Sequence, residues 1–138
     1  MRGESERIAM RARYAFRVTI RLEPVAADCS LEDPTVERRC FLEAAEPGTD
    51  GWRRFRELLW RGELTDAAYG RALFTEKLGL PVEDVEFRAF YTDEEYLEAL
   101  EDEIEANLES FKAESVTEVL SKYFASSLEV GVDHGLEM

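Results

Sequence analysis

The sequence has few of the residues that carry most catalytic and metal chemistry. Its 138 residues include one histidine, His134, and two cysteines, Cys29 and Cys40, whose spacing matches no zinc-binding pattern. There is no Gly-x-Ser-x-Gly, no His-Glu-x-x-His and no phosphate-binding glycine loop. We therefore expect no metal site, no cofactor and no catalytic residue. Acid–base chemistry by a carboxylate pair stays open, because 31 residues are acidic.

Long hydrophobic runs are also absent. No run approaches the roughly 18 apolar residues of a membrane span, and residues 1–10 hold no secretory signal. We expect a cytoplasmic protein with no membrane partner. There, Cys29 and Cys40 would be reduced thiols, with a bridge between them across a hairpin as the alternative. The chain is 45% hydrophobic and has eight Phe, five Tyr and two Trp, which is enough to fill the core of one domain.

Lysine is scarce and acid is abundant. Only three of the 17 basic residues are lysine, and 31 acidic residues bring the net charge to −14. Residues 1–61 hold 12 basic and 11 acidic residues, whereas residues 62–138 hold 5 and 20. Such a surface repels nucleic acid and anionic membranes, although very high salt screens the repulsion. The composition predicts a halophilic protein. The alternative is an ordinary acidic protein with one heavily charged helix.

Alternation with period two predicts three strands, at Arg13–Leu22, Thr35–Ala45 and Val82–Thr92. The first two are expected to pair antiparallel. The predicted inward residues are Tyr14, Phe16, Val18, Ile20 and Leu22, then Val36, Cys40, Leu42 and Ala44, then Val85, Phe87, Ala89 and Tyr91. The outward face of the second strand would carry Glu37, Arg39, Phe41 and Glu43. Arg38 interrupts the second pattern, because it falls on the apolar side.

Helical spacing predicts four helices. The first runs from Gly51 to Arg61 with Trp52, Phe55 and Leu59 inward, and Gly62 would end it. The second begins at Thr65 or Asp66 and ends at Gly79, with Tyr69, Ala72, Leu73 and Leu78 as its apolar residues. The third begins with a capping box of Thr92 and Glu95 and carries Leu97, Leu100, Ile104, Leu108 and Phe111. The fourth begins at Ser115 and turns Val119, Leu120, Tyr123 and Phe124 inward.

The order of these elements is strand, strand, helix, helix, strand, helix, helix, with a short edge strand at Ser127–Val132 as a further option. This order predicts an α+β fold, in which helices pack on one face of a small, mainly antiparallel sheet. We expect a disordered leader at 1–10, a single domain at 11–132 and a frayed tail at 133–138. Because regular patterning begins just after Met10, a start at Met1 or at Met10 stays open.

A row of arginines on the outward sheet face is the first candidate binding site. It comprises Arg13, Arg17 and Arg21 of the first strand, with Arg39 and Arg88 expected on neighbouring strands. Such a row could clamp a small anion, or dock the acidic helix of a partner or of a second copy. The favoured interpretation is that these arginines pair with Glu37, Glu43 and Glu86 across the same face.

Residues 51–63 form the second candidate site, because they combine tryptophan with arginine. Trp52 is expected in the core, whereas Trp60 and Arg61 lie off that face at the helix end. Exposed tryptophan and arginine are typical of binding hot spots. The arginines that could hold phosphate here are Arg53, Arg54, Arg56 and Arg61. The favoured interpretation is structural: Trp60 folds over the sheet edge, and Arg61 bonds the last carbonyls of its own helix or a carboxylate.

The run Leu59-Trp60-Arg61-Gly62-Glu63, after Gly51-Trp52, resembles the small haloarchaeal family called LWR-salt proteins, named for such a motif and for salt-loving hosts. Shorter similarities are Tyr14-Ala15-Phe16-Arg17-Val18, Val85-Glu86-Phe87-Arg88, Thr92-Asp93-Glu94 with Tyr96-Leu97, and Tyr123-Phe124-Ala125-Ser126-Ser127. The resemblance covers most of residues 13–130. It implies a halophilic archaeal source and brings no catalytic residue. Its motif falls on Leu59, Trp60 and Arg61.

The acidic run from Asp93 to Glu109 could bind Ca²⁺ or Mg²⁺, but it has no EF-hand spacing. We expect a solvated helix face that attracts solvent cations.

Three functional hypotheses follow. The leading one is a non-enzymatic interaction or accessory protein of a halophilic cytoplasm, which contacts a protein partner or a second copy through Trp60, Arg61 and the arginine face. The second is a nucleic-acid-associated regulator that acts at high salt. The third is an anion-binding or enzymatic domain in which Arg17 and Arg21 grip a ligand in a closed pocket.

Overall fold

A computed structural model describes residues 11–131, so the predicted leader and the tail at 133–138 lie outside the described residues. The elements are, in chain order, β1 (Ala12–Arg21), β2 (Thr35–Glu43), α2 (Arg54–Leu58), β3 (Leu59–Trp60), β4 (Glu63–Leu64), α3 (Ala67–Leu78), β5 (Val82–Thr92), α4 (Glu94–Ala106), α5 (Leu108–Phe111), α6 (Val116–Phe124) and β6 (Leu128–Val130). Strands and helices are mixed without regular alternation, which confirms the α+β prediction.

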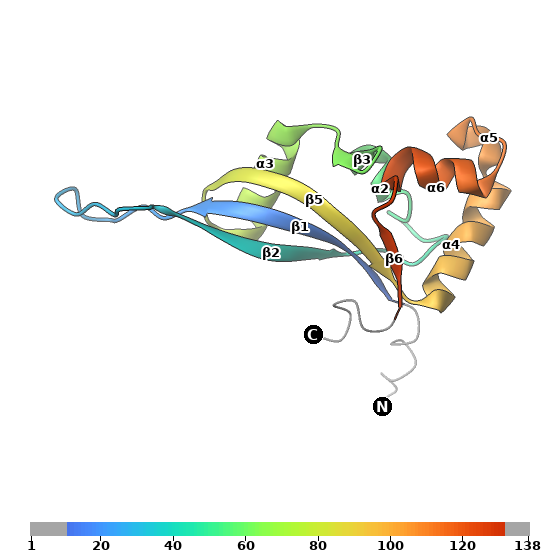
Figure 1. The fold of residues 1–138 in the computed structure, drawn as a ribbon, viewed down its shortest axis with the longest axis horizontal. Helices are drawn as coiled ribbons and strands as arrows, with labels where there is room; N and C mark the ends of the chain where they lie inside the picture. The colour runs from blue at the N-terminus through green and yellow to red at the C-terminus, as the bar shows by residue number, and fades with distance from the viewer. Residues whose placement is uncertain (1–10, 132–138) are drawn as a thin grey trace, which may run out of the picture.

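The main sheet has the strand order β2-β1-β5-β6. Strand β1 pairs antiparallel with β2 and β5, and the short β6 runs parallel to β5 at the edge. Figure 1 shows the helices of residues 11–131 on one side of this sheet, so none of these helices covers its other face. The predicted sheet and helix layer are therefore confirmed. Within residues 11–131, no helix is long and apolar enough to cross a membrane.

A bulge in β5 corrects the predicted faces of that strand. Ala15 of β1 pairs with Ala89, but the next residue, Phe16, pairs with Phe87, so Arg88 is an extra residue in β5. The alternation therefore changes phase at Arg88. The residues beyond the bulge that are fully buried are Phe90 and Thr92, whereas Tyr91 is only partly buried and bonds Arg39 of β2. The prediction that Tyr91 shares the inward face of Val85 and Phe87 was wrong.

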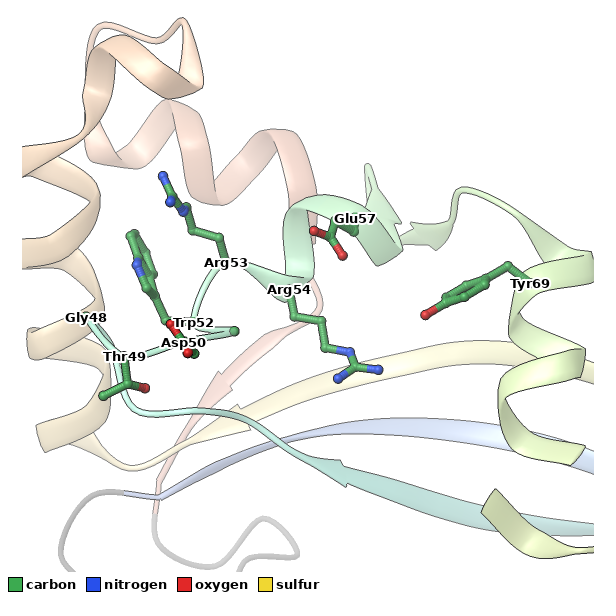
Figure 2. A pocket seen from close by; sticks show the side chains of 9 residues that line it. Gly48, Thr49, Asp50, Trp52, Arg53, Arg54, Glu57 and Tyr69 are labelled. Atoms are coloured by element: carbon green, nitrogen blue, oxygen red, sulfur yellow. The ribbon is translucent and has the colours of Figure 1, made fainter. Parts of the chain in front are cut away.

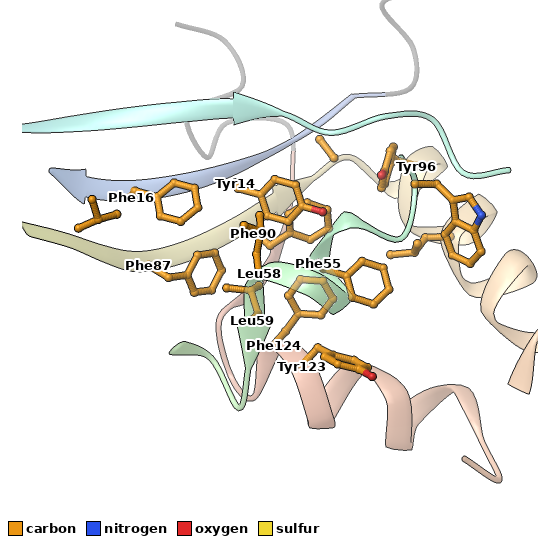
Figure 3. Close-up of a cluster of buried hydrophobic side chains, with 14 of the residues drawn as sticks. Tyr14, Phe16, Phe55, Leu58, Leu59, Phe87, Phe90, Tyr96, Tyr123 and Phe124 are labelled. Carbon is orange, nitrogen blue, oxygen red and sulfur yellow. The ribbon is translucent and has the colours of Figure 1, made fainter. Parts of the chain in front are cut away.

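Aromatic rings from distant parts of the chain fill the core between the sheet and the helices (Figure 3). Phe90 of β5 lies at its centre: its ring centroid is 4.6 Å from that of Tyr14 in β1 and 4.8 Å from that of Phe124 in α6. Phe55 of α2 contacts Phe124 at 5.1 Å and stacks on Phe111 of α5. The core therefore joins β1 and β5 to α2, α5 and α6.

Two predicted helix features are wrong in detail. In α3, the residues that reach the core are Gly70 and Phe74, while Tyr69, Ala72 and Leu78 of the predicted apolar set are exposed and Leu73 is partly buried. The cap of α4 is Asp93 and not Thr92, because β5 continues through Thr92. Asp93 accepts hydrogen bonds from the backbone amides of Tyr96 and Arg11. The predicted third helix also divides at Asn107 into α4 and α5.

The fourth helix and the edge strand are confirmed. Ser115 caps α6 by accepting a bond from the Glu118 amide, and Val119, Tyr123 and Phe124 are buried. β6 lies within the predicted Ser127–Val132 segment and joins the sheet edge.

The segment 51–61 differs most from its prediction. The helix there is only α2, and the chain then turns directly into a hairpin of β3 and β4. Leu59 pairs with Leu64, and Trp60 pairs with Glu63. Gly62 therefore does not end a helix but lies at the tip of this hairpin.

Candidate functional site

The Leu59-Trp60-Arg61 run forms one strand and half of the turn of the β3–β4 hairpin. The two residues of the turn are Arg61 and Gly62, whose φ angles are 54° and 80°. Positive φ at both central residues is what a tight two-residue hairpin requires, and glycine adopts it without steric cost. Behind the turn, the Thr65 amide donates to the Leu58 carbonyl at 2.9 Å and closes the hairpin against α2.

The tip of this hairpin caps the C-terminal end of α6. The Arg61 amide donates to the Lys122 carbonyl at 2.8 Å, and the Gly62 amide donates to the Tyr123 carbonyl at 2.9 Å. The other two terminal carbonyls, of Ser121 and Phe124, accept from Ala125 and Ser127. All four carbonyls that a helix normally leaves without an intrahelical partner are therefore bonded. Two of these four bonds come from a segment some 60 residues earlier in the chain.

Gly62 also lies too close to α6 for a side chain. A Cβ atom there would lie 3.2 Å from the Phe124 carbonyl oxygen and 3.3 Å from the Ala125 Cβ. Both the positive φ and the close approach therefore select glycine at this position.

The three side chains of the motif differ sharply in burial. Leu59 is fully buried in the core, whereas Trp60 is 44% exposed. The Trp60 ring meets the Tyr123 ring edge-on at 5.9 Å, and the Arg61 guanidinium lies 5.6 Å from the Trp60 ring centre. These contacts differ from the predicted carbonyl or carboxylate bond of the Arg61 side chain, because only the Arg61 backbone bonds carbonyls. An open depression of about 280 Å³ lies beside Trp60 and Arg61, next to α6.

On the helix-free face of the sheet, three of the five predicted arginines pair with carboxylates. Arg17 forms an ion pair with Glu86, and its Nη1 atom lies 3.9 Å from the Oε1 atom of Glu37. Arg21 lies 2.6 Å from Glu83 and 3.6 Å from Glu23, and Arg88 lies 3.6 Å from Glu86. Glu37 and Glu86 are partners as predicted. Glu23 and Glu83 were not predicted, and the predicted partner Glu43 forms no ion pair among residues 11–131.

The other two arginines, Arg13 and Arg39, stack on aromatic rings instead. The Arg13 guanidinium lies 4.2 Å and that of Arg39 lies 5.2 Å from the Phe41 ring centre, and Arg39 donates to the Tyr91 hydroxyl at 2.9 Å. Neither has a carboxylate within 4.0 Å among residues 11–131. The Nε and Nη2 atoms of Arg13 are buried without a hydrogen-bond partner. We call Arg13, Arg39, Phe41 and Tyr91 the arginine–aromatic cluster.

A model of the family described as LWR-salt protein matches residues 10–134 of the chain. The protein belongs to the LWR-salt protein family. The match covers every described element, so the LWR-salt resemblance seen in short motifs extends over the whole fold. Neither the curated proteins nor the solved structures contain a match to this LWR-salt chain.

The structure divides the predicted binding residues of this LWR-salt protein between two places. Trp60 and Arg61 belong to the helix layer, where β3 lies beside α6 (Figure 1). Arg13, Arg17, Arg21, Arg39 and Arg88 belong to the sheet. The motif and the arginine row therefore do not form one contact surface.

The arginines proposed to hold phosphate are also dispersed. Arg53 lies over the Trp52 ring, and Arg56 bonds the Ser110 carbonyl and lies over Phe111. Arg53 and Arg54 both line one pocket, which includes neither Arg56 nor Arg61. Arg61 instead lines the depression beside α6.

The remaining predictions concern thiols and metals. Cys29 and Cys40 are both free thiols, so the alternative of a bridge between them is not realised, and burial raises the pKa of Cys40. Within the described part of the chain, no group of three or more His, Cys, Asp or Glu side chains is placed to hold a metal ion. Five of the seven acidic residues of α4 are exposed, whereas Glu101 and Glu103 are partly buried.

Proposed function

We propose that this protein is a non-enzymatic interaction protein of a salt-rich cytoplasm, and that the arginine–aromatic cluster is its contact surface. The observation that carries the proposal is the state of Arg13. Its guanidinium is stacked on Phe41, two of its nitrogens lack acceptors, and no carboxylate among residues 11–131 neutralises it. The two nitrogens are covered by the chain itself, so a carboxylate from a partner would act on the positive charge of the guanidinium and not on these two donors.

The surroundings of the cluster support the same proposal. Ion pairs neutralise Arg17, Arg21 and Arg88 on this face, so within residues 11–131 the positive charge that no ion pair compensates lies at Arg13 and Arg39. None of the described helices covers the face (Figure 1). Arginine beside tyrosine and phenylalanine is a composition typical of binding hot spots. The chain as a whole has a net charge of −14, but this cluster is positively charged. The partner would therefore be a protein whose surface carries carboxylates where it meets Arg13 and Arg39.

A pull-down with matched double variants tests the proposal. Immobilised wild type, Arg39→Ala/Phe41→Ala and Arg17→Ala/Glu37→Ala are exposed to a lysate of the source cells at one KCl concentration, after circular dichroism shows that each is folded. The second variant is the control, because it removes the ion pair between Arg17 of β1 and Glu37 of β2 on the same face of the sheet. We expect a protein that wild type and control retain and that Arg39→Ala/Phe41→Ala loses.

Other outcomes contradict the proposal. Equal retention by all three proteins would exclude the cluster as the contact surface. Loss of the retained material after nuclease treatment would favour the nucleic-acid hypothesis instead.

A Trp60→Ala/Arg61→Ala variant is expected to keep the partner, because these side chains lie in the helix layer, away from the sheet face.

A further inference from the structure

A second site lies in the helix layer, away from the arginine–aromatic cluster. It is a pocket of about 550 Å³ between the turn at residues 48–53, α2 and α3 (Figure 2). This volume lies in the range of small-molecule sites, about 300–1,000 Å³. The lining is mostly polar and includes Asp50, Arg53, Arg54, Glu57 and Tyr69.

Two opposite charges line this pocket without pairing with each other. Arg54 and Glu57 are three residues apart on α2, a spacing at which side chains can form an ion pair. Among the described residues, neither side chain has an ion pair or a hydrogen bond. Figure 2 shows Arg54 extending from α2 toward the sheet and the Tyr69 hydroxyl pointing from α3 toward α2, while the Glu57 carboxylate lies beside α2 and turns away from Tyr69. Arg54 is partly buried, so its unpaired charge is partly removed from water.

Burial has the largest effect on the pKa of the Tyr14 hydroxyl and raises it, whereas Arg54 lowers this pKa and Glu57 raises it. The other charges of the lining, Arg53 and Asp50, are exposed, and Arg53 lies over the Trp52 ring. The four charges sum to zero, which favours a ligand without net charge over a phosphate dianion.

We propose that this pocket binds a small zwitterion of the amino-acid class, with its carboxylate on Arg54 and Tyr69 and its ammonium on Glu57. The guanidinium supplies paired donors for the carboxylate, and the Tyr69 hydroxyl supplies one more. The Glu57 carboxylate accepts from the ammonium. This site is independent of the contact surface proposed above, because none of its residues lies on the helix-free face.

The tryptophan content allows a direct binding test. The chain has two tryptophans, so Trp60→Phe leaves Trp52, which lines the pocket, as the sole reporter. In this background we would titrate alanine, leucine and glutamine at constant ionic strength and follow Trp52 fluorescence. The amide resonances of Gly48 and Gly51, which also line the pocket, give a second readout by NMR. Propionate and 4-carbamoylbutanoate are the matched acids that lack the ammonium group of alanine and glutamine.

We expect at least one amino acid to shift both signals with a Kd below about 10 mM, and its matched acid to bind about tenfold more weakly. Arg54→Gln and Tyr69→Phe should each weaken binding of the amino acid. Tyr69→Phe is the safer variant for folding, because Tyr69 is 48% exposed. Glu57→Gln should weaken binding of the amino acid but not of the acid. Arg88→Gln, on the opposite face, should change neither.

Three results would overturn the proposal. The first is no saturable response to any of the three amino acids. The second is equal affinity for an amino acid and its matched acid, which would indicate a general anion site. The third is unchanged binding in both Arg54→Gln and Tyr69→Phe, which would place the ligand elsewhere.

Discussion

The backbone amide of Gly62 donates to the carbonyl of Tyr123 at 2.9 Å, and this bond joins the tip of the β3–β4 hairpin to the last turn of α6. The neighbouring bond from Arg61 to Lys122 completes the cap. α6 in turn packs Phe124 against Phe90 of β5 and leads into β6 at the edge of the sheet. The Leu59-Trp60-Arg61 motif thus has a structural role: its hairpin caps α6 through backbone hydrogen bonds.

The two apolar side chains of the motif should differ in their effect on stability. Leu59→Ala should lower the free energy of unfolding by about 2–5 kcal/mol, because Leu59 is fully buried. Trp60→Ala should cost about 1 kcal/mol, since it loses the edge-on Tyr123 contact of a ring that is 44% exposed. Urea unfolding followed by circular dichroism measures both. A larger loss for Trp60→Ala would show that the tryptophan, and not the backbone with Leu59, holds the hairpin in place.

Two buried tyrosines should make the fold sensitive to alkali. Burial raises the pKa of Tyr14 and of Tyr96 well above the ordinary value of 10.0. A raised pKa in the folded state means that their contribution to stability is complete below about pH 10 and declines as the pH rises further. The free energy of unfolding, measured in urea across this range, should therefore fall above about pH 10.

Tyr96→Phe isolates one of these two groups. It should make the decline at high pH shallower and cost about 1 kcal/mol at neutral pH, because the Tyr96 hydroxyl donates to the Ala45 carbonyl at 2.7 Å. Absorbance at high pH reports tyrosine ionisation in the same samples. Ionisation of all five tyrosines in a chain that is still folded would contradict this account.

The charge of −14 should make stability depend on salt. Raising KCl from about 0.1 M to about 2 M should raise Tm, because it screens repulsion among the carboxylates. The triple variant Glu98→Gln, Asp102→Asn, Glu105→Gln removes three exposed acids from α4 and should show a smaller rise. Differential scanning calorimetry at matched protein concentration makes the comparison. A Tm that is the same at both concentrations would contradict the proposed adaptation to a salt-rich cytoplasm.

The sheet was predictable because β1 alternates cleanly and β2 and β5 alternate over most of their length. Tyr14, Phe16, Val18 and Ile20 recur at every second position of β1, and a half-buried strand needs no other signal. The alternation of β5 ends at Arg88, where one extra residue changes its phase. The bulge is set by how β5 pairs with β1, so the alternation along β5 alone did not identify it. As a result, the sequence placed Phe41 on the outer face but not Tyr91, and half of the aromatic part of the cluster was missed.

The hairpin was not predictable from local spacing. Trp52, Phe55 and Leu59 have helical spacing, and Gly62 suits a helix end as well as a hairpin turn. The structure selects the hairpin because the Arg61 and Gly62 amides satisfy carbonyls of α6, which lies far along the chain.

Matched glycine substitutions test the cap most directly. Gly62 and Gly79 both have positive φ, 80° and 74°, but a Cβ at Gly79 would meet no atom within 4 Å, whereas one at Gly62 would press against the Phe124 carbonyl and Ala125. Gly79→Ala therefore measures the backbone cost alone, about 1 kcal/mol. We would compare the free energy of unfolding of Gly62→Ala and Gly79→Ala in urea. If the hairpin caps α6, Gly62→Ala costs at least about 1 kcal/mol more, because both capping bonds are displaced. Equal losses for the two variants would contradict the structural role of the motif.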